Sequence, residues 1–599
     1  MNLPVRKRWQ VLPPAPAEHL QHFGDLPPLV VQLLYNRGLS EASEVAAFLA
    51  APGEELLGDP FALRDMPLAV QRIHQAIADG ERIVVYGDFD VDGITSAALL
   101  VQTLQTLGAR ASPYIPRRLE EGYGLNMGAL DRLAAESVRL VITVDNGISA
   151  LDEVDHAQAL GIDVIVTDHH HVPPQLPRAV AILNPKRPDC PYPFKELAGV
   201  GVALKLAQAL LVPSSRLRPE AQPEGFQVPS FTLRGLEHET WNLERGTCWN
   251  MELGLDLVAL GTVVDMAPLI GENRALVRRG LAMLNQTQRP GLLAMIARAG
   301  LRLGQIDSSA LSFTLGPRLN AAGRIDDAIT SYRLLVTDSP DEAATLADDL
   351  EAKNQERQRL TAEVLERARS QACELGDARL LLVAGEGYAA GVVGLVAGRL
   401  VDEFYRPALV VEWGEERSRG SARSIPEFNI VAALTECQDL LVRFGGHAMA
   451  AGFTIETPRL AALQGRLLAI ADRELRGLDL TPTLFVDAEL PLAQASWATY
   501  NWVSKLAPFG YANPTPTFLS RHVHVRAARL VGSNHLRLKL ADGPQVWDAI
   551  GFRLGDWAEP VKEHSSIDLV YTIEVNQWGA EEPVLQLNVK DIRLHKRQA

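Results

Sequence analysis

The stretch IVVYGDFDVDG (residues 83–93) decides the fold, because it joins an apolar run to a cluster of three aspartates. The run IVVY is rich in β-branched and aromatic residues and lacks polar alternation, which is typical of a strand buried on both faces of a parallel sheet. Three later stretches repeat the order of an apolar run followed by acidic or histidine residues: LVITVDNG (140–147), DVIVTDHHH (163–171) and LGTVVDMAP (260–268). We therefore predict four buried strands of one parallel sheet, each followed by a polar cluster.

These polar clusters predict a single metal centre. The carboxyl ends of the strands in an open α/β sheet meet at one crevice, so the clusters should converge there. Carboxylates gathered at one point repel one another strongly unless cations lie between them, and imidazole beside carboxylate suits manganese or a similar divalent ion. The sequence therefore predicts a hydrolytic centre built on hard metal ions. Its candidate groups are six aspartates and two histidines: Asp88, Asp90, Asp92, Asp145, Asp168, Asp265, His169 and His170.

Taken singly, each of these residues has a simpler interpretation. An aspartate after a strand is more often a helix cap or a solvated loop residue than a ligand. The pattern DxDxDG also resembles the start of a calcium-binding EF-hand loop, but the twelfth position holds Leu99 instead of glutamate. The occurrence of four such clusters in one domain favours the metal centre. His171 extends the third cluster, and we interpret it as a surface-loop residue.

The bulk composition indicates a globular intracellular protein of several domains. A chain of 599 residues is too long for one core, and 47% hydrophobic with 22% charged residues is ordinary. No segment is apolar enough for a membrane span or a signal peptide, and the four cysteines form no CxxC pair, so we expect a cytoplasmic location without membrane association. The net charge of −15 counts against a nucleic-acid partner unless cations and local arginines compensate for it.

The hydrophobic patterns divide the chain into five segments. Strand and helix patterns alternate through residues 82–167, as βαβ units require. After Pro340, residues up to 375 contain neither glycine nor proline, which predicts a helix of roughly 50 Å. We expect a helical lead-in (1–55), a parallel-sheet α/β domain (56–338) with an inserted surface segment (213–247), a connecting helix (339–375), a second α/β domain (376–478) and a barrel of antiparallel strands, of the OB type (479–599).

The motif order DxDxDG, VDNG, TDHH and GTVxDxxP resembles the DHH phosphoesterase superfamily. Further stretches narrow the resemblance: YIPRRLEEGYGLN, AILNPKRPDCPYPFKELAGVGVALKL, LGPRLNAAGRI, GVVGLVAGRLVDEFYRPALV, FGGHAMAAGF and PFGYANPTPTF. From about residue 55 onward the chain is similar to the RecJ family of bacterial single-stranded-DNA-specific exonucleases. The resemblance implies a DHH catalytic domain at 56–338, a DHHA1 substrate-binding domain at 376–478 and an OB-fold nucleic-acid-binding domain at 479–599.

The resemblance also implies two divalent cations, Mn2+ or Mg2+, and assigns a role to each motif residue. Paired ions generate a hydroxide at neutral pH and hold the attacking and leaving oxygens of an in-line displacement. Asp145 would bridge the ions, and His170 would face the scissile phosphate, so these two are the candidate catalytic residues. One ion would be held by Asp90 and Asp145 with Asp88 nearby, and the other by Asp92, Asp145, His169 and Asp265.

Substrate contacts are expected from several further segments. In PRLNAAGR, the side chains of Arg318, Asn320 and Arg324 combine donors with small neighbours, which suits a phosphate, although a turn with structural arginines is the alternative. Tyr123 is a candidate stacking platform near the metal centre; for Phe509 and Tyr511 packing is at least as good an interpretation. The resemblance adds contacts from the DHHA1 domain: Arg399, Ser421 and Arg423 of the GSxRS motif, and Gly446 and His447 of the GGH turn.

Two positions depart from the family pattern. The chain has Tyr388-Ala389 where the family usually has Trp-His, which removes an imidazole that could touch substrate. Ala422 replaces the central glycine of GSGRS, and we expect its methyl group to enter a loop that approaches the substrate closely. Neither position belongs to the metal ligands.

These observations predict a metal-dependent exonuclease that degrades single-stranded DNA from the 5′ end into mononucleotides in recombination and repair. Polarity and DNA preference come from the resemblance. One alternative is a DHH/DHHA1 phosphodiesterase of cyclic dinucleotides or short oligonucleotides, against which the long helix and the barrel argue. Another is a DHH relative that only holds DNA, against which the intact acidic clusters argue. We expect a monomer with single-stranded DNA as partner, and a single-strand-binding protein and a helicase as candidate protein partners.

Overall fold

A computed structural model describes residues 7–50, 57–117, 121–122, 124–212, 254–532, 534–561, 566–576 and 583–595. Tyr123 and the expected insertion at 213–247 lie outside these ranges. The chain divides into two compact units, and each is described by itself. One unit contains residues 50–355 and 508–514, and the other contains residues 1–49, 356–507 and 515–599.

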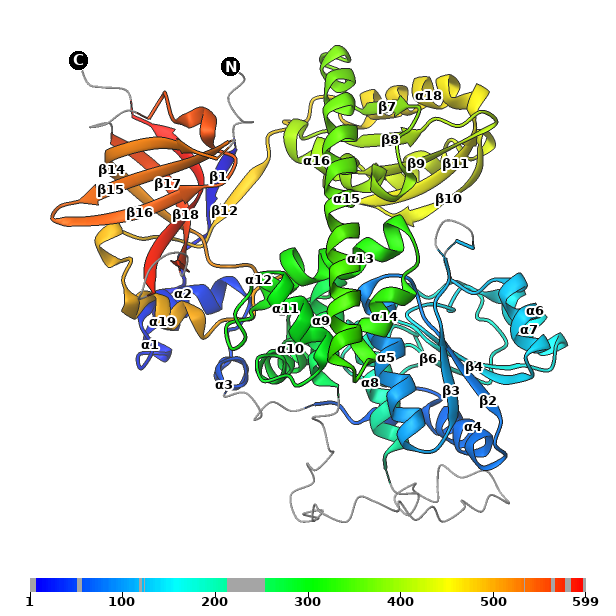
Figure 1. Cartoon of the computed structure of the whole chain (residues 1–599). Helices are drawn as coiled ribbons and strands as arrows, with labels where there is room; N and C mark the ends of the chain where they lie inside the picture. Colours follow the sequence, from blue (N-terminus) through cyan, green and yellow to red (C-terminus); the bar gives the residue numbers. More distant parts are fainter. Residues whose placement is uncertain are drawn as a thin grey trace. The chain divides into compact units, whose positions relative to one another are not determined.

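The unit that begins at residue 50 is built on a five-stranded parallel sheet, drawn in blue and cyan in Figure 1. Its strand order is β3-β2-β4-β5-β6. Parallel neighbours require crossover connections, which agrees with the alternation of strand and helix patterns in the sequence. The parallel sheet predicted from the apolar runs is therefore confirmed. The strands are β2 (Arg82–Tyr86), β3 (Arg110–Tyr114), β4 (Val138–Val144), β5 (Asp163–Thr167) and β6 (Ala181–Leu183).

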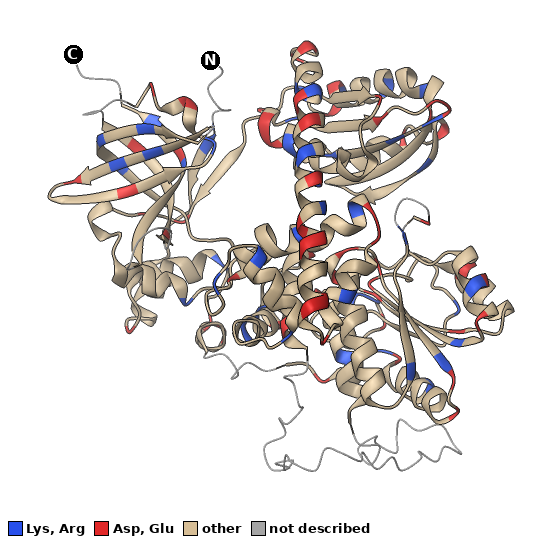
Figure 2. Ribbon diagram, viewed as in Figure 1, with Lys and Arg blue, Asp and Glu red and all other residues tan. Residues whose placement is uncertain are grey.

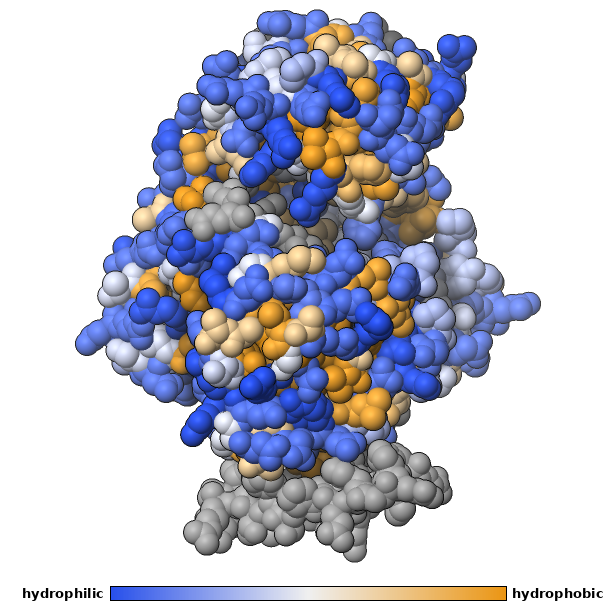
Figure 3. All heavy atoms as spheres, turned by 90° about the vertical axis from the view of Figure 1, so that its right-hand side faces the viewer, coloured by the Kyte–Doolittle hydropathy of each residue, from blue (hydrophilic) through white to orange (hydrophobic). Residues whose placement is uncertain are grey.

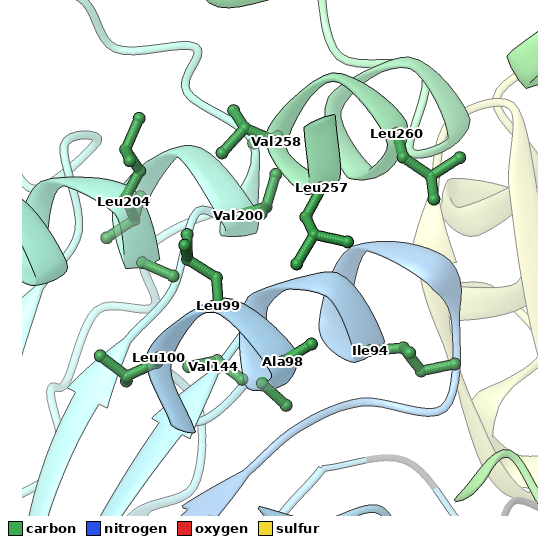
Figure 4. Packing of buried hydrophobic residues seen from close by; sticks show 14 of the residues in the cluster. Ile94, Ala98, Leu99, Leu100, Val144, Val200, Leu204, Leu257, Val258 and Leu260 are labelled. Atoms are coloured by element: carbon green, nitrogen blue, oxygen red, sulfur yellow. The ribbon is translucent and has the colours of Figure 1, made fainter. Parts of the chain in front are cut away.

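Helices cover both faces of this sheet, because alternate strand residues point to opposite sides. Ile83 and Val85 of β2 pack with α4 (Met66–Ala78), α5 (Val91–Thr106) and α8 (Gly199–Leu210), whereas Val84 packs with α6 (Met127–Ala135) and α7 (Leu151–Ala159). Figure 4 shows the centre of the first core, where Leu99 and Leu257 lie between α5, α8 and α9 (Leu255–Val264). Burial on both faces explains why the strands carry continuous apolar runs.

The prediction of a fourth strand before Asp265 is wrong. The residues Leu255–Val264 form the helix α9, and Asp265 is its C-cap. Every residue from Leu255 to Val263 is buried, so this helix has no polar face. A short apolar run of Val, Leu and Thr that is buried all round carries no periodicity to separate helix from strand.

Further helices complete this unit. A π-helical turn, η4 (Leu311–Leu315), leads into α13 (Gly316–Ile325), which carries the PRLNAAGR sequence. The segment 508–514 belongs here and not to the barrel, since the backbone N–H of Leu269 donates to Tyr511 O and the Ser308 hydroxyl donates to Phe509 O. The remaining helices are α10 (Gly271–Leu284), α11 (Pro290–Arg298), α12 (Ser308–Ala310) and α14 (Ile329–Val336).

A single helix of 35 residues, α15 (Pro340–Glu374), begins in this unit and continues into the other. Its start and end agree with the predicted connecting helix within one residue. Acidic and basic residues alternate along it, as Figure 2 shows, and pairs such as Arg359 with Glu356 and Glu363 support it at helical spacing.

The second α/β domain, in the other unit, contains a mixed five-stranded sheet with the order β10-β11-β9-β8-β7. Only β7 and β8 are parallel; the other neighbours are antiparallel. Its elements are β7 (Leu381–Gly385), α16 (Ala390–Phe404), β8 (Ala408–Glu412), β9 (Arg417–Arg423), α17 (Ile430–Thr435), β10 (Leu441–His447), β11 (Ala450–Glu456) and α18 (Leu460–Glu474).

The C-terminal strands form the predicted OB-type barrel, which closes because β14 pairs with both β15 and β17. Closure leaves few free strand edges. The N-terminal segment was expected to be helical, but it also contains a strand, β1 (Arg8–Val11), which pairs with β12. The other elements are α1 (Ala17–His22), α2 (Pro28–Asn36), α3 (Ala42–Leu49), β12 (Thr483–Val486), β13 (Ala488–Glu489), α19 (Trp497–Ser504), β14 (Phe518–Val531), β15 (His535–Asp542), β16 (Gln545–Gly551), β17 (Ser566–Asn576) and β18 (Val584–Leu594).

The face in Figure 3 is mostly hydrophilic, with apolar patches separated by polar areas. Among the helices in the described ranges, none is long and apolar enough to cross a membrane.

Candidate metal centre

The loop after β2 and the first turn of α5 supply three carboxylates. Asp90 is the N-cap of α5, and its Oδ1 accepts the N–H groups of Asp92 (2.9 Å) and Gly93 (3.1 Å). Asp92 is buried in the first turn, and its two oxygens accept the N–H groups of Gly199 (2.7 Å) and Val200 (2.8 Å) at the start of α8. The positive end of a helix dipole therefore fixes Asp92. The AGVGVA stretch of the sequence thus has a role that the sequence alone did not reveal.

Asp145 follows β4 in a strained conformation. Its φ angle of 62° lies in the left-handed region, which is costly for a residue other than glycine and is found mainly where function requires it. The side chain is buried, and its Oδ1 lies 2.9 Å from Nε2 of His169. The turn thus aims the carboxylate toward the histidine that follows β5.

Asp168 holds the two histidines that follow β5. Its Oδ1 accepts the N–H groups of His169 (2.7 Å) and His170 (3.0 Å) and lies 2.7 Å from His170 Nδ1. Its Oδ2 accepts the N–H of Ile148, which ties the end of β5 to the turn after β4. The sequence placed Asp168 among the candidate ligands without a separate role. Among the described residues Asp168 belongs to none of the candidate metal-ligating groups, and its contacts with His170 make it a positioning residue for that side chain.

The candidate ligands form three groups in which the ligand atoms of each group lie within 4.8 Å of one another. One group is Asp88, Asp90 and Asp145; the others are Asp92, His169 and Asp265, and Asp145, His169 and His170. Asp145 and His169 each belong to two groups, so the three groups adjoin. Although Asp265 follows a helix instead of a strand, the C-cap of α9 brings it to the same point.

Crowding and burial shift the ionisation of these groups. Burial and the negative charge of Asp90 raise the pKa of Asp92 to about 7. Burial and the charges of Asp92 and Asp90 likewise raise the pKa values of Asp145 and Asp265 well above the ordinary range. Burial and the neighbouring His170 lower the pKa of His169 to about 3. The site therefore places carboxylates that lack compensating charge beside a neutral imidazole.

His170 differs from its neighbour. Burial lowers its pKa, but the hydrogen bond and charge of Asp168, with the charges of Asp88 and Asp90, outweigh this effect, and the pKa is raised overall. The side chain is about one third exposed (36%), whereas that of His169 is 11% exposed. His171 lies beyond them as an exposed residue.

Helix α13 lies against the loop between β2 and α5. Asn320 accepts the N–H of Val91 through Oδ1 at 3.0 Å, and a Cβ at Gly323 would approach Phe89 O to 2.6 Å. Arg318, however, donates from Nε to Glu351 (2.6 Å) and from Nη1 to Thr314 O (2.8 Å). The predicted phosphate contact of Arg318 therefore competes with an ion pair between α13 and α15. Arg324 lies partly exposed at the end of α13.

The second α/β domain brings four of its five predicted substrate residues together. Ser421 and Arg423 lie on β9, and Gly446 and His447 lie on β10, two strands away across β11. Gly446 has a φ of 144°, and a Cβ there would collide with the backbone of Ala450, so the turn requires glycine. Arg399 is exposed on α16, where its charge opposes the rise that burial causes in the pKa of Asp402.

Comparisons with known proteins agree with this arrangement. Models of the DHH family N-terminal domain, the DHHA1 domain and the RecJ OB domain match residues 82–226, 377–476 and 486–591. The single-stranded-DNA-specific exonuclease RecJ of Bacillus subtilis is 37% identical over 603 residues, which cover 100% of this chain and 72% of that protein. RecJ of Escherichia coli is 34% identical over 571 residues, or 92% and 94% of the two chains. The chain belongs to the RecJ family.

Solved structures of RecJ proteins share the fold. The crystal structure of RecJ from Thermus thermophilus in complex with Mn2+ superposes with a TM-score of 0.79 at 29% identity and covers 99% of this chain and 80% of that one. A structure of the same protein in complex with Mg2+ gives a TM-score of 0.73. Both ions are divalent and accept oxygen and nitrogen ligands.

The residues present here fit such ions. Carboxylates with raised pKa values surround a neutral imidazole, and a divalent cation would relieve their repulsion. Gly199 leaves room for these carboxylates because it has no side chain. A Cβ at this position would lie 2.8 Å from both Asp92 Oδ2 and Asp145 Cβ. Glycine at the start of α8 is thus needed for the ligands to converge.

The two departures from the RecJ pattern lie in the core of the DHHA1 domain. The GSAR residues are part of β9 and do not form a loop, and Ala422 is fully buried against the apolar core on the opposite side from Ser421 and Arg423. The expectation that its methyl group would approach the substrate is therefore wrong, because alternate strand residues face opposite sides. Tyr388 is also fully buried, with the guanidinium of Arg367 over its ring at 4.9 Å.

The substitution Gly199→Ala should weaken divalent-ion binding without unfolding the protein. The added methyl group displaces Asp92 and its hydrogen bonds to α8, and loss of such supporting contacts typically costs about 10–100-fold in metal affinity. Isothermal titration with Mn2+ measures this. Gly128→Ala on α6 is the matched control, because the nearest atom to its Cβ is 3.5 Å away. Equal affinities for the two variants would contradict the role of Gly199.

Proposed function

We propose that this chain is a divalent-metal-dependent exonuclease that hydrolyses single-stranded DNA. The observation that carries the proposal is the buried cluster of carboxylates and His169 at the ends of β2, β4, β5 and α9. Such a cluster serves metal-assisted hydrolysis, and a protein that only held DNA would have no use for it. The substrate follows from the RecJ relatives, which match across the full chain and are single-stranded-DNA-specific exonucleases.

We further propose that two ions bind, Mn2+ or Mg2+, and that Asp145 bridges them. Three adjoining ligand groups support this, since one ion could not use all of them, and Asp145 belongs to two of the three. Asp88, Asp90 and Asp145 would hold one ion, and Asp92, Asp145, His169 and Asp265 the other. When bound, the ions supply a nucleophile at neutral pH and stabilise the charge on the phosphate oxygens.

The protein residues orient the phosphate around this centre. Asp168 Oδ1 lies 2.7 Å from Nδ1 of His170, so His170 would face the substrate through Nε2, and the raised pKa favours the imidazolium that can donate to a phosphate oxygen. Asn320 and Arg324 on α13, beside the loop between β2 and α5, would hold the neighbouring phosphate. In the DHHA1 domain, Arg399, Ser421, Arg423, Gly446 and His447 would contact the strand.

The remaining proposals rest on the family resemblance alone. The chain would act from the 5′ end and release mononucleotides in recombination and repair. It would work as a monomer in the cytoplasm, with a single-strand-binding protein and a helicase as partners that present the strand.

The proposed reaction predicts a definite pattern of products. Oligonucleotides labelled at either end, single-stranded or as duplex, are incubated with Mn2+, Mg2+ or chelator and separated on a gel. We expect labelled mononucleotide at once from the 5′-labelled single strand, delayed release from the 3′-labelled strand, little reaction with duplex and none in chelator. Equal rates on duplex, or early release from the 3′ end, would contradict the assignment of substrate or polarity. Undiminished digestion in chelator would contradict the metal mechanism.

The substitution His170→Ala should lower kcat by about 10²–10⁴-fold while the metal content stays the same, because His170 acts as a proton donor and not mainly as a ligand. Single-turnover kinetics and elemental analysis of the dialysed protein measure the two effects separately. His171→Ala is the matched control, since this neighbouring residue is exposed and should leave kcat nearly unchanged. Loss of metal in proportion to loss of activity would instead show that His170 is a ligand.

A further inference from the structure

One face of the DHHA1 sheet carries more basic residues than the family motifs account for. Along β9, Ser418, Gly420 and Ala422 are buried, while the alternate residues are partly or fully exposed. The buried set faces the core formed with β11, α17 and α18. Arg417 and Arg419 therefore lie on the same face as Ser421 and Arg423, which are already proposed to contact substrate.

The pairing of β9, β11 and β10 arranges this face in rows. Arg423, Ala450 and His447 form one row, and Ser421, Gly452 and Gly445 form the next. Arg419, Thr454 and Arg443 form the third row. Successive rows are two residues apart on each strand, so the third row lies about 13 Å from the first.

The middle of this face is hollow. A Cβ added to Gly445 or to Gly452 would meet no atom within 4 Å, so the second row offers open space between two basic rows. At the third row the surface sinks into a hollow of about 520 Å³, whose lining includes Arg417, Arg419 and Arg443. Trp413, which is 43% exposed, also lines the hollow.

The charge of this hollow is only partly balanced within the protein, by Glu412, which lies directly opposite Arg419 in the pairing of β8 with β9. Other arginines of the domain are ion-paired: Arg473 lies 2.6 Å from Glu436, and Arg466 pairs with Asp439. In contrast, Arg417, Arg419 and Arg443 form no ion pair and no side-chain hydrogen bond with any residue that the structure describes. Glu412 is the one acidic side chain in the lining, against three arginines. In a chain of net charge −15, this local excess of guanidinium groups over carboxylates favours an anionic ligand.

We propose that this face binds the sugar–phosphate backbone of the single strand, with Arg417, Arg419 and Arg443 as a second phosphate subsite beyond the one at Ser421, Arg423 and His447. Guanidinium groups bind phosphate in bidentate geometry, and Trp413 offers a stacking surface for a base. At the stacked spacing of about 3.4 Å per nucleotide, 13 Å corresponds to about four nucleotides, and to fewer in an extended strand. The inference rests on the proposed function. It implies that a substrate must be long enough to span both phosphate subsites in order to make all of its contacts.

The double substitution Arg419→Ala with Arg443→Ala tests this subsite. Binding of fluorescent oligothymidylates of three and twelve nucleotides is measured by anisotropy over a series of salt concentrations, with Ca2+ in place of the active metal. We expect the variant to bind the 12-mer at least tenfold more weakly than the wild type, and to bind the 3-mer equally well. The slope of log K against log salt should fall by about 1.4, since each phosphate contact on a single strand contributes about 0.7. Hydrolysis of the 3-mer in Mn2+ should be unchanged.

The matched control is Arg466→Ala with Arg473→Ala, which removes the same charge from ion-paired positions of the same domain. An equal loss of 12-mer affinity in the control, or none in the test variant, would overturn the subsite while leaving the exonuclease activity intact. Loss of 3-mer affinity in the test variant would also overturn it, because the arginines would then belong to the first subsite. A wild-type protein that neither bound nor degraded the 12-mer would overturn the proposed function as well. If the protein bound polyglutamate instead of DNA, and this binding depended on Arg419, the ligand of this face would be an acidic protein segment and not the DNA strand.

Discussion

The mutual repulsion of buried carboxylates is the constraint on which this structure depends. Asp92, Asp145 and Asp265 lie close together with little access to water, and their pKa values are raised for that reason. Without compensation the groups would take up protons or move apart. A divalent cation removes the conflict, because its charge replaces those protons. Metal binding therefore contributes to the free energy of folding of the unit that contains the parallel sheet.

The rest of the unit keeps the ligands together in spite of that repulsion. Backbone N–H groups of α8 hold Asp92, and the strained turn at Asp145 directs its carboxylate toward His169. Asp168 uses both oxygens to fix the loops after β4 and β5 and to orient His170. In the proposed function, the metal centre would supply the chemistry common to phosphodiester hydrolysis, and the basic rows of the DHHA1 sheet would contact the polymer.

The sequence predicted the strands β2, β4 and β5 and the long helix α15, because continuous β-branched runs and uninterrupted helical composition are local signals. The structure also brings the predicted ligand candidates close together. Prediction from the sequence failed where the outcome depends on surroundings. Helix α9 is apolar on all sides, so its residues resemble a strand. The ion pair of Arg318 with Glu351 joins residues 33 positions apart, and no local pattern reveals it. Ala422 was expected in a loop but lies in β9. The register of β9 is set by its pairing with β8 and β11, which no local pattern reveals.

The most direct test of the account is an anomalous difference map, recorded at the manganese absorption edge from crystals grown with Mn2+. The account predicts two peaks, both in contact with Asp145, one between Asp88 and Asp90 and the other between Asp92, His169 and Asp265. A map in which the carboxylate cluster holds no manganese, or in which the ion is bound without Asp145, would contradict the claim that cations balance the repulsion at this site.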